Sequence, residues 1–202
     1  LGTLGFTHCC IEDIGVLRSI PGIKIISPAD SFETVKALEA AIKSEDSIYI
    51  RLTGSSNNPI VYNKDYSFEI GKSIKLKEGK DVTIFATGAS VHSSLEAAKK
   101  LEENNISCAV INMHTIKPID FEAINEACGF SKLIVSIEEH NVIGGLGSAI
   151  AEHKAKLKHS PQLLTLGIDD KYIKGGTYNF LKEKYGLTAN KIVSNIIQSL
   201  NS

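Results

Sequence analysis

The sequence predicts an α/β protein, in which a partial α/β domain is followed by a second α/β domain with a mostly parallel sheet. Two observations predict this class. Short runs rich in Val, Ile and Leu alternate with longer stretches whose apolar residues recur every three or four positions, as buried strands and amphipathic helices do. The alternation is interrupted by one segment rich in Gly, Ser, Asn and Pro, residues 53–72, which is typical of a boundary between two units.

Before this boundary, the pattern predicts a helix, a strand, a second helix and a second strand. Residues 11–20 carry apolar side chains at helical spacing, and Pro21-Gly22 ends that helix. Residues 23–27 form a short β-branched run that is typical of a buried strand. Asp30 or Ser31 can cap the next helix, and residues 47–52 are expected to form the next strand.

After the boundary, strands and helices alternate regularly. Alternation of this kind predicts parallel strands joined by right-handed crossovers. Small strands are also expected near residues 68–70 and 73–76. The remaining strands are expected at residues 82–86, 108–112, 133–137 and 163–167, with helices at 90–104, 121–129, 148–157, 178–184 and 188–200. We therefore expect a first domain at residues 1–60, a linker at 61–78 and a second domain at 79–202.

Composition excludes several classes of function. The chain has 202 residues and a net charge of −1, which gives no electrostatic basis for binding nucleic acid or an anionic membrane. No apolar run approaches the length of a membrane-spanning helix. The four cysteines form no CxxC pair, which favours reduced thiols in the cytoplasm over a disulfide framework. The six histidines show no zinc-ligand spacing.

Ligands in open α/β sheets bind outside the carboxyl ends of the strands, and this rule selects three loops of the second domain. Residues 87–90 could cradle a phosphate or form the tight turn that any strand–helix unit needs. In residues 112–120, His114 and Lys117 could face a partner domain. Residues 138–147 end in a glycine-rich loop, which indicates either close approach of a ligand or a buried helix start.

The opening loop holds reactive side-chain types in its run Thr7-His8-Cys9-Cys10. A helix is expected to begin near residue 11, so the positive end of that helix would lie close to His8. A histidine in such a position can exchange a proton near neutral pH. The alternative is a surface histidine without a chemical role.

Five segments together resemble the C-terminal section of transketolase. In chain order they are GFTHCCIEDIGVLRSIPGIKIISPADSFET, SIYIRL, GKDVTIFATGASV, NMHTIKPID and EEHNVIGGLGSAIAE. The resemblance covers essentially the whole chain and is greatest to the split type, in which a separate subunit carries the pyrimidine-binding and C-terminal domains. It implies that residues 1–60 are the second half of a pyrimidine-binding domain and that residues 79–202 are the C-terminal domain.

The resemblance also implies roles for individual residues. His8 would be the catalytic histidine that contacts substrate near the thiazolium, and Thr7 would contact substrate beside it. Arg51 would grip the substrate phosphate with its forked donors. Leu4 stands where the family has an aspartate that recognises a substrate hydroxyl, so the sugar is left unspecified. Thiamine diphosphate and Mg²⁺ are implied for the complete enzyme, and none is expected on this chain alone.

The implied activity is the transfer of two-carbon ketol units between phosphorylated sugars. Partners would be the N-terminal transketolase section or subunit, a sugar phosphate, and a second copy bound through the C-terminal domain, with residues 144–147 as candidates for close approach. The chain alone is expected to be inactive. Alternatives are an enzyme like deoxyxylulose-phosphate synthase or the β subunit of a 2-oxoacid dehydrogenase, or a non-catalytic dimerisation module.

Overall fold

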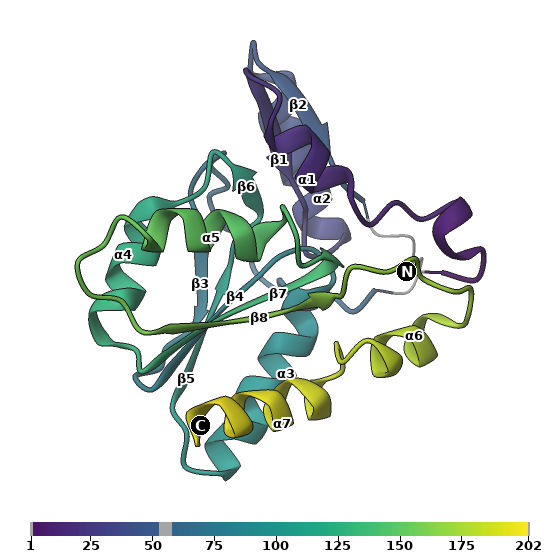
Figure 1. Ribbon diagram of the computed structural model, residues 1–202. Coiled ribbons are helices and arrows are strands. Elements are labelled where there is room, and N and C mark those ends of the chain that lie inside the picture. The colour runs from purple at the N-terminus through teal and green to yellow at the C-terminus, as the bar shows by residue number, and fades with distance from the viewer. Residues whose placement is uncertain (1, 53–57, 202) are drawn as a thin grey trace.

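A computed structural model describes residues 2–52 and 58–201, and within them the strands form two sheets (Figure 1). The larger sheet has the strand order β3-β5-β4-β7-β8, and the smaller sheet has the order β2-β1-β6. Helices flank both sheets, and most neighbouring strands run parallel. The predicted α/β class with a mostly parallel sheet is therefore confirmed.

The larger sheet is parallel except at one edge. Its strands are β3 (Ile74–Lys77), β4 (Val82–Ala86), β5 (Cys108–Asn112), β7 (Leu133–Asn141) and β8 (Gln162–Ile168). Strand β4 pairs in parallel with β5 and β7, whereas β3 runs antiparallel to β5. All residues of β4 and β5 are buried, which explains why these strands are largely apolar and do not alternate between apolar and polar residues.

Helices cover both faces of the larger sheet (Figure 1). On one face lie α3 (Ser90–Glu103) and α7 (Ala189–Leu200), and on the other lie α4 (Phe121–Phe130) and α5 (Leu146–Lys154). Neighbouring residues of β4 point to opposite cores: Ile84 packs with α3 and α7, and Phe85 packs with α4 and α5. This division is the two-faced burial that a parallel strand requires.

The smaller sheet takes a strand from a distant part of the chain. Strands β1 (Ile23–Ile26) and β2 (Ser47–Ile50) are parallel, and they alternate in the chain with α1 (Asp13–Arg18) and α2 (Ser31–Ile42). Strand β6 (Thr115–Lys117) follows β5 in the chain but pairs antiparallel with β1. The sequence predicts only a loop here, because three residues ahead of a proline carry no readable periodicity.

A buried carboxylate cluster joins α2 to the larger sheet. Asp30 caps α2 by accepting from Glu33 N at 2.8 Å, which identifies Asp30 as the cap. Glu33 is fully buried, and its carboxylate accepts from Asn112 Nδ2 of β5 at 2.9 Å and from Tyr66 Oη at 2.9 Å. Burial raises the pKa of Glu33, and the surrounding donors oppose that shift.

Helix α1 rests on the loop between β7 and α5. Asn141 N donates to Ile11 O at 2.8 Å, and Arg18 Nη1 donates to Gly144 O at 2.8 Å. A Cβ atom on Gly144 would lie only 2.8 Å from Gly15 Cα, and Gly144 has φ +80°. Glycine at this position therefore allows two backbones of the same chain to touch.

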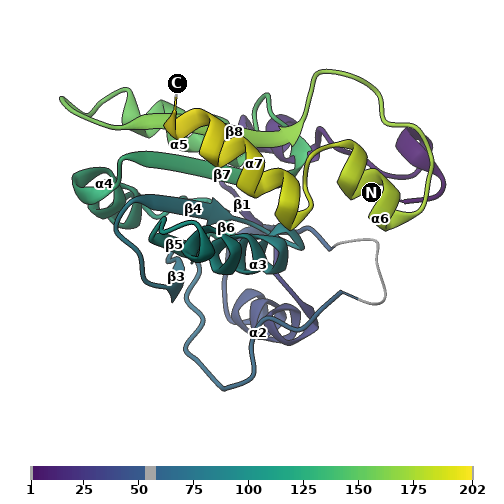
Figure 2. The same ribbon diagram turned by 90° about the horizontal axis from the view of Figure 1, so that it is seen from below.

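The opening turn packs against the loop before α6 (Tyr178–Lys184), and Figure 2 shows this turn beside α6. The turn is a short 3₁₀ helix, η1 (Gly5–Thr7). A Cβ on Gly175 would lie 2.2 Å from Thr3 O, and a Cβ on Gly5 would lie 2.8 Å from Gly175 N. The opening loop is thus in backbone contact with a segment about 170 positions later in the chain.

Most predicted elements are present, although several of their bounds differ from those predicted. The first helix begins at Asp13, two residues later than predicted, and no strand forms at residues 68–70. The segment 66–70 is instead held by side-chain contacts, such as the stack of Phe68 on His114 with 4.1 Å between ring centroids. Of the helices in residues 2–52 and 58–201, none has the length and apolar character needed to cross a membrane.

Gly144→Ala is expected to destabilise the chain more than Gly22→Ala. Both glycines have positive φ, +80° and +77°, so each change adds backbone strain of about 1 kcal/mol. Only at Gly144 would the new methyl group overlap a neighbouring backbone, since nothing lies within 4 Å at Gly22. The overlap is expected to cost about 1–3 kcal/mol more. Denaturant unfolding measures both variants, and equal losses would contradict the close contact with Gly15.

Candidate active site

The opening loop presents His8 to solvent directly after η1. Thr7 Oγ1 donates its hydrogen to Leu4 O at 2.8 Å. The same oxygen lies 2.9 Å from His8 Nδ1, so the ring nitrogen is the donor in that contact. A neutral His8 ring therefore carries its proton on Nδ1 and keeps Nε2 as a hydrogen-bond acceptor, the form that a general base requires.

Arg51, the residue after β2, is held by a largely buried ion pair. Its Nε donates to Asp13 Oδ2 at 2.7 Å, and the two side chains are 13% and 10% exposed. Tyr49 Oη donates to the same carboxylate oxygen at 2.8 Å. Burial, together with the hydrogen bond to Asp13, raises the pKa of Tyr49 to about 12, so its hydroxyl remains a donor.

The guanidinium of Arg51 also bridges two distant segments. Its Nη2 donates to Cys10 O and to Glu139 O, each at 3.1 Å. Arg51 therefore reaches the opening loop two residues after His8, although the structure shows no hydrogen bond from Arg51 to Thr7 or His8 in the described residues. Within the same residues, Nη1 is the nitrogen of this guanidinium without a hydrogen-bond partner.

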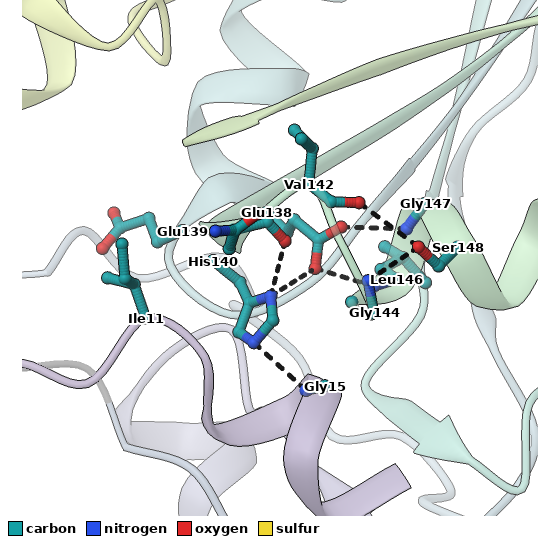
Figure 3. Close-up of polar contacts among 12 residues, drawn as sticks. Ile11, Gly15, Glu138, Glu139, His140, Val142, Gly144, Leu146, Gly147 and Ser148 are labelled. Atoms are coloured by element: carbon teal, nitrogen blue, oxygen red, sulfur yellow. Dashed lines mark hydrogen bonds and ion pairs between the residues drawn. The ribbon is translucent and has the colours of Figure 1, made fainter. Parts of the chain in front are cut away.

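Glu138 fills the glycine-rich loop at the start of α5, as Figure 3 shows. Its two carboxylate oxygens accept from Leu146 N at 2.7 Å and Gly147 N at 2.9 Å. A Cβ on Gly145 would lie 2.1 Å from Glu138 Oε2, which explains the glycine. Burial raises the pKa of Glu138 to about 7, although the two N–H donors favour its charged form. The loop is therefore a buried helix start that the chain itself occupies.

His140 links this loop to α1 (Figure 3). Nδ1 lies 2.6 Å from Asn141 O, so it carries the proton, and Nε2 accepts from Gly15 N at 3.2 Å. The side chain is fully buried, and burial lowers its pKa. Because both ring nitrogens are engaged within the chain, His140 is a structural residue.

The other two loops predicted from the sequence, residues 87–90 and 112–120, contact residues that lie beside the strands of the smaller sheet. Gly88 N donates to Ser27 O at 3.1 Å, so residues 87–90 form a packing turn. Lys117 Nζ donates to Arg18 O at 2.9 Å, which agrees with the expectation that this side chain faces the other unit. His114 is buried, and burial lowers its pKa to about 4.

The sequence interpretation missed three residues that shape the site: Asp13, Tyr49 and Tyr178. Tyr178 of α6 donates to the carboxylate of Glu139. Asp13 stands in the first turn of a helix, where a carboxylate is ordinary. Tyr49 and Arg51 are two residues apart, and this spacing places both on the same face of a strand. This spacing is the feature of the sequence that could have suggested the Asp13–Tyr49–Arg51 cluster.

Two family models match the chain. One, described as the transketolase C-terminal domain, matches residues 71–192, and the other, described as the transketolase pyrimidine binding domain, matches residues 1–58. A 6-deoxy-6-sulfo-D-fructose transketolase subunit from Clostridium sp. (strain MSTE9) is 39% identical over 189 residues, which cover 94% of this chain and 58% of that protein.

Two further proteins extend this comparison. A 1-deoxy-D-xylulose-5-phosphate synthase from Caldanaerobacter subterraneus subsp. tengcongensis is 35% identical over 98% of this chain and 32% of that protein. A solved structure described as a split gene transketolase, inactive β4 tetramer, is 39% identical with a TM-score of 0.87, over 96% of this chain and 62% of that one. The chain thus spans 58–62% of these two transketolase relatives.

Glu138→Gln is expected to flatten the dependence of stability on pH. The pKa of Glu138 is raised to about 7 in the folded state, from about 4.3 when unfolded, so its protonated form favours folding. That contribution is complete below the unfolded pKa and is lost as pH rises from there through about 7, by about 4 kcal/mol in total. Urea unfolding at pH 5 and pH 8 measures the difference. Glu39→Gln, at an exposed position, is the control, and an unchanged slope in Glu138→Gln would contradict this assignment.

Proposed function

The chain belongs to the transketolase family, and from this premise we propose that it forms part of an enzyme transferring two-carbon ketol units between phosphorylated sugars. The observation that carries the proposal is the exposed His8, whose Nε2 is an available acceptor. The rest of the enzyme would come from an N-terminal transketolase section or subunit, a proposal supported by the similarity to a transketolase subunit and to a split gene transketolase. We further propose cytoplasmic location, and assembly of two copies through the C-terminal domain.

Thiamine diphosphate and Mg²⁺ are proposed for the complete enzyme. Bound, the cofactor supplies the carbanion chemistry of ketol transfer. In residues 2–52 and 58–201, no group of three or more His, Cys, Asp or Glu side chains is placed to hold a metal ion. We propose that Mg²⁺ and the diphosphate are held by the N-terminal section, as the family resemblance implies. This is the reason to expect no activity from the chain alone.

His8 is proposed to take a proton from, or donate a hydrogen bond to, a substrate oxygen. The neutral ring accepts through Nε2, and a protonated ring would donate from the same atom. Thr7 Oγ1 is already engaged by Leu4 O and His8 Nδ1, which supports a positioning role for Thr7 in place of direct substrate contact. Thr7 would then fix which nitrogen of His8 faces the substrate.

Arg51 is proposed to contact the substrate phosphate through Nη1. The ion pair with Asp13 and the two carbonyl contacts hold the guanidinium in one orientation. A rigid, always charged donor is suited to a phosphate. The family resemblance implies a contact in which two guanidinium nitrogens donate to the phosphate. Here only Nη1 would donate, because Nε and Nη2 already donate to groups within the chain.

A second candidate is the formation of a deoxysugar phosphate from pyruvate. It is favoured by the 35% identity to a 1-deoxy-D-xylulose-5-phosphate synthase over 98% of this chain. Assays of the complete enzyme with a ketose phosphate and with pyruvate separate the two reactions. Turnover of pyruvate without ketol transfer would replace the leading proposal.

Arg51→Ala in the complete enzyme is expected to raise KM for phosphorylated sugars by about tenfold to a hundredfold, because a hydrogen bond between charged groups contributes that much to binding. KM for an unphosphorylated donor should change far less. Asp13→Asn is the matched control, because it weakens the ion pair but keeps the guanidinium. Equal effects of Arg51→Ala on both kinds of substrate would show that Arg51 only supports the fold.

His8→Ala in the complete enzyme is expected to lower kcat by at least about tenfold, as loss of a positioned proton carrier does. His8→Asn should recover part of the activity if hydrogen bonding suffices, and little if proton transfer is required. Thr7→Val tests the positioning role, and it should lower kcat while leaving the affinity for thiamine diphosphate unchanged. An intact kcat in His8→Ala would identify His8 as a surface histidine.

A further inference from the structure

A buried lysine at the end of α5 has an unusual set of partners. Lys154 is only 7% exposed, and its Nζ donates to Pro161 O at 2.6 Å and to Cys128 Sγ at 3.7 Å. Among the described residues, no carboxylate forms an ion pair with this ammonium. Lysine is rarely buried without such a pair, because removing its charge from water is costly. The sulfur of Cys128 is therefore one of two protein atoms that solvate the charge.

Cys128 lies on α4, which packs beside α5 on the same face of the larger sheet (Figure 1). The residue is partly exposed. The other cysteines offer useful contrasts. Cys108 is fully buried, and burial raises its pKa to about 12. Cys10 is exposed but donates to the carboxylate of Glu12, and its pKa is raised, first by burial.

We propose that Cys128 and Lys154 are an oxidation-sensitive pair that a hydroperoxide converts into a covalent sulfur–nitrogen bond between α4 and α5. The proposal rests on the 3.7 Å separation of Nζ and Sγ, on the burial of Lys154 and on the partial exposure of Cys128. It concerns residues outside the candidate active site and is independent of the proposed function.

The first step oxidises the sulfur. Cys128 releases its thiol proton to solvent, and its sulfur attacks one oxygen of hydrogen peroxide. The oxygen–oxygen bond breaks, and the Lys154 ammonium gives a proton to the leaving hydroxide, which departs as water. The products are a sulfenic acid on Cys128 and a neutral amine on Lys154. Sulfur has lost two electrons and the peroxide has gained them.

The second step is a condensation. The Lys154 amine attacks the Cys128 sulfur, the bond between sulfur and the sulfenic oxygen breaks, and that oxygen leaves as water after taking one proton from the nitrogen. The product is a sulfenamide, Sγ–Nζ, and both peroxide oxygens have become water. Attack on sulfenic acids by nitrogen is known chemistry of cysteine oxidation. Two equivalents of an added thiol reverse the bond, because they return the free cysteine and lysine and become a disulfide.

Mass spectrometry of the full 202-residue chain tests the proposal. The chain is treated with hydrogen peroxide, quenched with catalase, and digested without reductant. We expect one cross-linked species that joins the peptides of Cys128 and Lys154, lighter than their sum by two hydrogen atoms and released by dithiothreitol. Cys128 is expected to be consumed at least about tenfold faster than Cys108, as partly exposed thiols beside a lysine are.

Three variants separate chemistry from folding, with circular dichroism to check each fold. Cys128→Ser should form no cross-link. Lys154→Arg keeps the positive charge without a primary amine, so dimedone should trap a sulfenic acid on Cys128 and no cross-link should form. Lys156→Arg, at an exposed position two residues later, should cross-link as the unaltered chain does.

Three outcomes would overturn the proposal. One is an unaltered chain whose Cys128 oxidises without joining Lys154. Another is preferential oxidation of Cys10 with Cys128 left intact. A third is a link between the two residues that carries an added oxygen, which would replace the condensation step with different chemistry.

Discussion

The antiparallel pairing of β6 with β1 is the contact on which the arrangement of the two sheets depends. A sheet of three short strands cannot bury two faces by itself. Strand β6 belongs to the smaller sheet but directly follows β5 of the larger sheet in the chain. The two sheets are therefore joined by a short segment of backbone. The outer side of α2 nevertheless leaves apolar residues exposed, with Val35 at 56% and Ile42 at 84%. An uncovered face of this kind supports the proposal that this chain binds an N-terminal section or subunit.

The polar groups between the two sheets are held in the protonation states that burial allows. Arg51 and Asp13 form an ion pair, and Tyr49 donates a second hydrogen bond to the same carboxylate oxygen. His140 is neutral because both nitrogens are satisfied by backbone groups, which need no charge on the ring. Two effects on the pKa of Glu138 oppose each other: the N–H donors at the start of α5 favour its charged form, and burial disfavours that form. The ion pair and His140 therefore stabilise the docking of α1 in different ways, whereas Glu138 holds the start of α5. Removal of either partner of the ion pair would leave a buried charge.

The sequence was informative for elements in which apolar residues recur at a regular spacing. The helices of the larger sheet and its apolar strands follow from spacing alone, because each strand is buried on both faces and each helix on one. Periodicity could not reveal β6, which is three residues long, or Asp13, whose partner Arg51 is 38 positions away. The glycine-rich loop at residues 144–147 had two interpretations, and only coordinates show that the Glu138 carboxylate occupies it. The role of Thr7 likewise depends on the direction of one hydroxyl hydrogen.

The opening loop that carries His8 is held chiefly by parts of the chain that supply no candidate catalytic group. Asn141 N of β7 binds Ile11 O, and Gly175 contacts Thr3 and Gly5 by backbone packing. Arg51 completes the support by joining Cys10 O to Glu139 O of β7. A general base is effective only when its nitrogen is fixed relative to the substrate oxygen. If His8 acts as proposed, its position is therefore set by β7 and the loop before α6. The C-terminal part of the chain then contributes to catalysis by holding the opening loop in place.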